Sequence, residues 1–166
     1  LFPNMTVLAP ADEYDLKSMV AWALKQDGPV AIRYPKAVLE TELSIRFGEN
    51  RLPISTRQCE QLIDGPDGLI IGCGSLVGSC LAAVEELQKE GLRVGLINAR
   101  FIKPLDKETL LKRIKMSPWV VSVEENMLQA GFGSAILEAI HDAAIDTGPI
   151  RRLGIPDRDR KSTRLN

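Results

Sequence analysis

The stretch that decides the fold class reads LIIGCGSLVGSCLAAVEEL, residues 69–87. Its first part, Leu69–Cys73, is a short apolar run of the kind that forms a strand buried on both faces. Its second part carries apolar residues at helical spacing, namely Val77, Leu81, Val84 and Leu87. The pattern stops near Gly91, a residue that favours helix ends. The stretch therefore predicts a buried strand followed by an amphipathic helix.

The alternation of strand and helix continues toward the C-terminal end of the chain. Further strands are predicted at 94–98, 119–123 and 150–155. Helices are predicted to open at Pro104–Asp106 and at Gly133-Ser134. Strands that alternate with helices are joined by right-handed crossovers, which give a mainly parallel sheet covered on both faces. The expected fold class is therefore α/β, with three layers in this part of the chain.

The first forty residues carry a separate β-α-β pattern. Thr6–Ala9 predicts a strand, and residues 30–34 predict a second one. Between them, acidic residues after Pro10 occupy the position where a helix N-terminus favours negative charge.

The rest of the chain divides at changes in pattern. Residues 41–54 lack a regular pattern and are interpreted as a linker, and 57–63 is a candidate edge strand. The predicted organisation is one unit at 1–40, a linker at 41–54 and a second domain at 55–157. The polar, basic residues 158–166 are expected to be a disordered or foreign tail, and the start at Leu1 suggests a fragment.

Composition and charge exclude several classes of protein. Apolar residues make up 45% and charged residues 26% of the 166 residues, as in globular domains. A net charge of −1 argues against nucleic-acid and membrane-surface binding, both of which need clustered positive charge. We find no secretory signal, and no apolar run reaches the roughly 18–20 residues that a membrane span needs. Three scattered cysteines favour a reducing, cytoplasmic location over a disulfide framework.

The glycine-rich turn and the nucleophilic residues give weak signals. Gly72–Gly78 has the spacing GxGxxxG, so tight-turn glycines are favoured over a phosphate cradle. Ser75 and Ser134 both follow glycines but lie outside a GxSxG motif. The single histidine, His141, is expected at a solvated helix position, where Glu138 is a candidate partner. The cysteines form no CxxC pair, so neither a metal site nor a catalytic triad is predicted.

Two carboxylates follow one another where a predicted strand ends, in Val123-Glu124-Glu125-Asn126. Ligands collect at this edge of open α/β sheets, and paired carboxylates can perform acid–base chemistry. The alternative is that both carboxylates only accept hydrogen bonds from nearby backbone N–H groups in a loop. We favour this structural interpretation.

Arg33 lies inside an apolar run, between Ile32 and Tyr34. An unpaired buried guanidinium is costly, so Arg33 needs an anionic partner. A carboxylate of the protein would serve structurally, and an oxyanion such as a substrate phosphate would serve functionally through a bidentate contact. The residues alone leave both possibilities open.

Several motifs, in order along nearly the whole chain, resemble the 1-deoxy-D-xylulose-5-phosphate synthase family. They are Pro3-Asn4-Met5, Ala9-Pro10, Asp27–Pro35, Asn98–Asp106, Val123–Asn126, Gly131–Ala135 and Leu153–Asp157. The resemblance implies that residues 1–40 end a transketolase-like pyrimidine-binding domain. It also implies that residues 55–157 form a transketolase C-terminal-like domain, which supports a homodimer in that family.

The resemblance further implies an activity for the parent enzyme. That family uses thiamine diphosphate and Mg2+ to decarboxylate pyruvate and to add the two-carbon unit to glyceraldehyde 3-phosphate. The product enters isoprenoid and thiamine synthesis. By resemblance, Arg33 belongs to an RYP motif and binds the phosphate of the aldehyde acceptor.

No catalytic, cofactor or metal-binding residue can be carried over to this chain, because the family's motifs for these roles lie before Leu1. The fragment alone is therefore expected to be inactive and to bind no cofactor. Lys36-Ala37 replaces the Arg-Gly that is common after the RYP motif. The alternatives are a β-type subunit of a thiamine-dependent 2-oxoacid dehydrogenase and a non-catalytic dimerisation module.

Overall fold

The computed structural model of the chain describes residues 3–36, 42–48 and 51–157. The tail predicted at 158–166 lies outside these residues. In chain order, the elements are β1 (Thr6–Leu8), α1 (Glu13–Ala23), β2 (Val30–Ile32), α2 (Glu42–Phe47), the short 3-10 helix η1 (Ile54–Thr56), β3 (Glu60–Ile63), β4 (Gly68–Gly72), α3 (Leu76–Lys89), β5 (Val94–Asn98), β6 (Phe101–Lys103), α4 (Lys107–Met116), β7 (Val120–Met127), α5 (Phe132–Asp142) and β8 (Ile150–Ile155).

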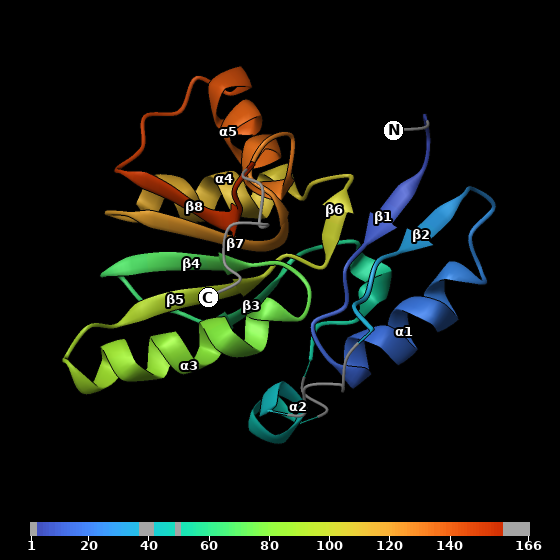
Figure 1. Cartoon of the computed structure of the whole chain (residues 1–166), viewed down its shortest axis with the longest axis horizontal. Helices are drawn as coiled ribbons and strands as arrows, with labels where there is room; N and C mark the ends of the chain where they lie inside the picture. Colours follow the sequence, from blue (N-terminus) through green and yellow to red (C-terminus); the bar gives the residue numbers. More distant parts are fainter. Residues whose placement is uncertain (1–2, 37–41, 49–50, 158–166) are drawn as a thin grey trace, which may run out of the picture.

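Among the described residues, the larger of two sheets has five strands in the order β3-β5-β4-β7-β8. The neighbours β4–β5, β4–β7 and β7–β8 are parallel, and β3 adds to β5 as an antiparallel edge. The prediction of a mainly parallel sheet is therefore confirmed, and so is the candidate edge strand. Figure 1 shows α3 on one side of this sheet and α4 and α5 on the other.

Alternate residues of the central strands face the two helical layers. Leu69 and Ile71 of β4 join a buried cluster with side chains of α4 and α5, including Ile114 and Phe132. Ile70, between them, packs into a second cluster with residues of α3. A strand with apolar residues on both faces is the pattern expected of a sheet covered on both sides.

The N-terminal unit forms β1, α1 and β2, with β1 and β2 parallel, as predicted. The second strand is shorter than expected, because β2 ends at Ile32. Arg33 comes just after it, although its backbone N–H still donates to the Leu8 carbonyl at 2.8 Å. Helix α1 begins after Asp12, whose carboxylate accepts from the Asp15 backbone N–H at 2.9 Å.

The smaller sheet joins the two parts of the chain, in the order β2-β1-β6. Strand β6 was not predicted, and it pairs antiparallel with β1. Figure 1 shows β6 extending from the larger unit to lie beside β1. The predicted linker also contains α2, whose Leu43 is fully buried in the cluster beneath α3. The segment between the two units is therefore folded against the second one.

A buried network of charges lies at the same junction. Arg51, from the predicted linker, contacts Asp12 at 2.8 Å, Asp15 at 3.4 Å and Glu60 at 2.8 Å. Arg100, whose side chain is fully buried, contacts Asp15 and Glu60, each at 2.8 Å. We call these five residues the junction network. It connects the start of α1 to β3 and to the end of β5.

Candidate functional site

The edge of the sheet where β4 and β7 end is the place where the fold can form a site. The two strands are neighbours in the sheet. After β4 the chain forms β5 on one side of β4, and it later forms β7 on the other side of β4. Ligands of open α/β sheets bind at such a reversal of strand order. Cys73 follows β4, whereas Glu124 and Glu125 lie within the last part of β7. The expectation that both carboxylates lie in a loop was therefore wrong, because β7 continues to Met127 and pairs there with Ile155 of β8.

Glu124 closes the N-terminus of α5. Its carboxylate is buried and accepts hydrogen bonds from the backbone N–H groups of Phe132 at 2.7 Å and Gly133 at 2.8 Å. Gly131 makes room for this contact, since a Cβ there would lie 2.4 Å from Glu124 Oε2. The structural interpretation of Glu124, a carboxylate bound to backbone donors, is confirmed.

Glu125 lies at the N-terminus of α3. Its Oε1 accepts a hydrogen bond from the Ser75 hydroxyl. Ser75 occupies the N-cap position of α3, but its side chain makes no hydrogen bond to the helix backbone. The preceding Gly74 has a φ of +70°, which glycine adopts without strain, as expected for a tight turn. Helix N-termini attract anions, and a carboxylate of the protein already lies at each of these two.

Arg33 reaches this edge from the N-terminal unit. It is half-buried, and its guanidinium lies beside the Cys73 thiol. Burial raises the pKa of the Cys73 thiol to about 12, Arg33 opposes this rise, and Glu124 and Glu125 add to it. Among the residues that the structure describes, none forms an ion pair with Arg33. Its predicted need for a partner is thus not met by a carboxylate of the described chain.

A cavity of about 570 Å³ opens beside these groups. Its lining includes Pro35, Leu76, Glu124, Glu125 and the end of β8. Pro35 is two residues from Arg33, so the cavity brings the RYP segment and the two carboxylates of β7 around one space. The volume is in the range of small-molecule sites.

The junction network is the charged cluster that sequence reasoning missed. Burial raises the pKa of the Asp15 carboxyl, and Arg100 and Arg51 oppose that rise. The guanidiniums occupy the space between the carboxylates, so the network does not fit a cation. Across residues 3–36, 42–48 and 51–157 no group of three His, Cys, Asp or Glu side chains could hold a metal ion.

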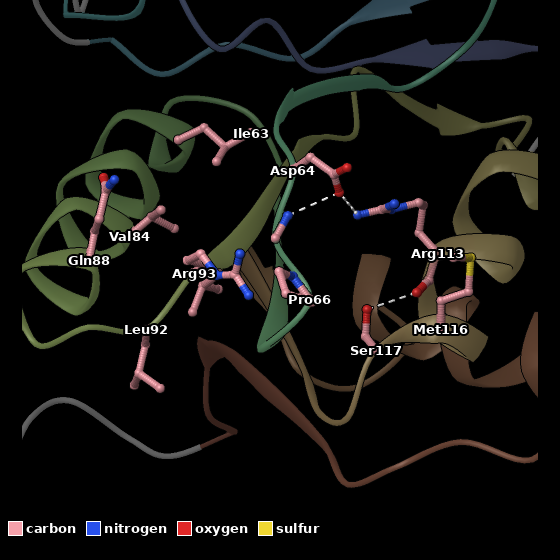
Figure 2. A pocket seen from close by; sticks show the side chains of 12 residues that line it. Ile63, Asp64, Pro66, Val84, Gln88, Leu92, Arg93, Arg113, Met116 and Ser117 are labelled. Carbon is pink, nitrogen blue, oxygen red and sulfur yellow. Dashed lines mark hydrogen bonds and ion pairs between the residues drawn. The ribbon is translucent and has the colours of Figure 1, made fainter.

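A second hollow, of about 500 Å³, lies at the opposite edge of the sheet, where β4 and β5 begin. Figure 2 shows Arg113 of α4 directed toward Asp64, with Arg93 and Pro66 in the middle of the hollow. Arg113 donates to Asp64 and thereby holds the pKa of that carboxyl below its usual range, and Arg93 lies 3.8 Å from Asp67. The arginines are paired and the helices α3 and α4 end here, so this hollow does not favour an anionic ligand.

The remaining candidates from the sequence are Ser134, His141 and the cysteines, and the structure gives none of them a contact typical of catalysis. Ser134 donates to the Leu128 carbonyl and accepts from Arg152, which ties α5 to β8. His141 is exposed near the end of α5. The three cysteines are buried free thiols. No described helix is long and apolar enough to cross a membrane.

Comparison with known families and sequences identifies relatives of this chain. The transketolase C-terminal domain family matches residues 57–165, and the transketolase pyrimidine-binding domain family matches residues 1–41. The chain is 42% identical over 161 residues to 1-deoxy-D-xylulose-5-phosphate synthase 1 of Geobacter sulfurreducens, covering 94% of this chain and 24% of the relative. It is 43% identical over 157 residues to the synthase of Halothermothrix orenii, with the same coverage of 94% and 24%. The chain therefore spans about a quarter of the length of these relatives.

Solved structures agree with the fold. A split-gene transketolase, described as an inactive beta4 tetramer, aligns over 98% of this chain and 52% of its own, with a TM-score of 0.79 and 27% identity. A transketolase of Pichia stipitis aligns over 91% of this chain and 21% of its own, with a TM-score of 0.62 and 18% identity. The second likeness concerns the fold alone. The expected fold class and the expected resemblance are both confirmed.

Proposed function

Because the chain belongs to the transketolase family, we propose that it forms the C-terminal part of a 1-deoxy-D-xylulose-5-phosphate synthase. About 40% identity to such synthases over nearly the whole chain supports the proposal. The enzyme would decarboxylate pyruvate and join the remaining two-carbon unit to the aldehyde carbon of glyceraldehyde 3-phosphate. It would act in the cytoplasm as a homodimer and supply isoprenoid and thiamine synthesis. The predicted division into 1–40, 41–54 and 55–157 remains part of this proposal.

We propose that the described residues alone do not hold thiamine diphosphate and Mg2+. Their largest carboxylate cluster is filled by Arg51 and Arg100, and the two helix N-termini at the sheet edge already contact Glu124 and Glu125. We therefore propose that the rest of the enzyme holds the cofactor and that this chain alone is inactive.

We assign Arg33 to the phosphate of the aldehyde acceptor. The observation that carries this assignment is the half-buried guanidinium without a carboxylate partner in the described residues, beside a cavity of about 570 Å³. The two carboxylates that line this cavity, Glu124 and Glu125, accept hydrogen bonds from other donors. A guanidinium offers the bidentate geometry that a phosphate prefers.

The test is Arg33→Ala in the full-length synthase. Charge-assisted hydrogen bonds contribute about 1.5–3 kcal/mol, so the KM for glyceraldehyde 3-phosphate should rise roughly ten- to hundredfold. The KM for pyruvate should change little. Arg33→Lys keeps the charge but loses the planar fork, and an intermediate effect is expected. Arg93→Ala, at the opposite edge of the sheet, is the matched control. Equal effects of Arg33→Ala on both substrates would refute the assignment.

A further inference from the structure

The two carboxylates near Arg33 are held in different ways, and this inference rests on the function proposed for Arg33. Two backbone N–H groups bind Glu124, and the backbone of α5 keeps them in place whatever the neighbouring side chains are. Glu125 accepts a hydrogen bond from a side chain, the hydroxyl of Ser75. A single substitution can therefore release Glu125 but not Glu124.

The Ser75 hydroxyl is free to make this contact because it does not cap α3. A capping serine has an extended backbone, whereas Ser75 has a helical one, with φ −59° and ψ −20°. In α3 the Ser75 side chain makes no capping hydrogen bond, and its hydroxyl donates to Glu125 across 50 residues of sequence. The hydrogen bond thus joins the α3 N-terminus to β7 next to the cavity that Pro35 and Glu125 line.

Releasing Glu125 would change what Arg33 can bind. Glu125 and Pro35 line the same cavity, and Arg33 lies two residues before Pro35, so both charged residues border this region. Opposite charges attract more strongly when they are partly buried than when they are in water. A carboxylate that pairs with the guanidinium competes with a phosphate for the same N–H donors.

We propose that Ser75 is a positioning residue that holds Glu125 away from Arg33 and so keeps the guanidinium open for the phosphate of the acceptor. The pair then determines the preference of the enzyme for a phosphorylated acceptor over an unphosphorylated aldehyde of the same chain length. Glu125 does not take part in the chemical step. Its contribution is the charge that must be kept away from Arg33.

The experiment compares Ser75→Ala, Glu125→Gln and the double variant in the full-length synthase, with glyceraldehyde 3-phosphate and with D-glyceraldehyde as acceptors. Ser75→Ala should raise the KM for the phosphorylated acceptor about tenfold, which corresponds to about 1.4 kcal/mol, and leave the KM for D-glyceraldehyde nearly unchanged. Adding Glu125→Gln to Ser75→Ala should restore most of the loss. Ser75→Thr, which retains the hydroxyl, should rescue the KM. Ser79→Ala, an exposed serine one turn further along α3, is the matched control.

A second readout separates binding from turnover. Inorganic phosphate, used as a competitive inhibitor against the aldehyde acceptor, should bind about tenfold more weakly to Ser75→Ala and recover in the double variant. If Ser75→Ala and the double variant lose the same affinity, or if Ser75→Ala leaves phosphate binding unchanged, the proposal is wrong. If Arg33→Ala raises the KM for glyceraldehyde 3-phosphate but Ser75→Ala does not, the phosphate-binding role of Arg33 is supported. In that case only the positioning role of Ser75 is wrong.

Discussion

Replacing Arg51 with methionine should lower the free energy of unfolding more than replacing an exposed arginine does. The Arg51 side chain is 1% exposed, and its Nε lies 2.8 and 2.9 Å from the two carboxylate oxygens of Glu60. Its other nitrogens contact Asp12 and Asp15. Methionine replaces the aliphatic stem of arginine but not its guanidinium, so three buried carboxylates are left with Arg100 as the remaining cation.

The expected cost follows from this charge imbalance. Removing one partner of a buried ion pair costs about 3–5 kcal/mol, because the other partner stays buried without compensation. A typical domain is stable by only about 5–15 kcal/mol, so the variant should lose a large share of its stability. Arg46→Met is the matched control. Arg46 is exposed on α2, 3.6 Å from Glu85, and its loss should change stability by no more than about 0.5 kcal/mol.

The penalty should depend on pH in a defined direction. Burial raises the pKa of the Asp15 carboxyl above its ordinary value of 3.8, and Arg51 opposes that rise. Without Arg51 the folded-state pKa of Asp15 rises further, so the folded variant binds a proton more tightly than the unfolded chain does. Its stability is therefore lost as the pH rises through that folded-state pKa. The difference between Arg51→Met and the wild type should be smaller at pH 4.5 than at pH 7.

Urea unfolding followed by circular dichroism at the two pH values measures this difference. Adding Glu60→Gln to Arg51→Met removes one of the unpaired carboxylates and should recover about 1–2 kcal/mol. A free energy of unfolding for Arg51→Met within 1 kcal/mol of the Arg46→Met value would refute the reasoning. So would a penalty that is equal at both pH values.

Two further predictions concern single groups. Asp106 caps α4 by accepting from the Thr109 backbone N–H at 3.1 Å and also accepts from the Cys59 N–H at 2.9 Å, so Asp106→Ala should cost about 1–2 kcal/mol in urea unfolding. Burial opposes ionisation of this carboxyl, but these hydrogen bonds outweigh the effect of burial and lower its pKa. The stability that Asp106 contributes should therefore disappear as the pH falls below 3.8. If the wild type and Asp106→Ala still differ in their free energy of unfolding at pH 2, this reasoning is wrong. The three buried thiols, with the pKa raised by burial to about 12 at Cys73 and Cys80, should react with an aromatic disulfide at pH 8 only after unfolding, and rapid reaction of the folded chain would show that one of them is accessible.

The regular elements could be predicted because their patterns are local. The apolar run at Leu69–Cys73 faces helices on both sides, as such a run indicates, and β3 lies at the edge where its weak pattern suggested. Strand β6 could not be predicted, because three residues before Pro104 carry no periodicity and form a strand only by pairing with β1. Helix α2 was also not predicted, because it too depends on a contact that is distant in sequence. Its Leu43 is buried in a cluster with residues of α3.

The charged groups were harder to interpret than the apolar ones. Arg51 lies in a segment without a pattern, and in sequence it resembles any solvated arginine. Only the folded chain brings it to Asp12, 39 residues away. For Arg33, the sequence identified the need for an anion but not its source. The structure shows which donors hold Glu124 and Glu125, a fact that depends on turns at Gly74 and Gly131 that no pattern specifies.

The junction network and the Arg33 site are coupled by the geometry of the N-terminal unit. Asp12 and Asp15 fix the start of α1, and α1 connects β1 to β2, which ends one residue before Arg33. Glu125, in contrast, is fixed by the larger sheet through Ser75. The separation between Arg33 and Glu125 therefore depends on how the two units are docked, and Arg51 of the linker contacts both units. A variant that loosens the junction network should weaken phosphate binding at Arg33 even though Arg51 itself does not line the cavity.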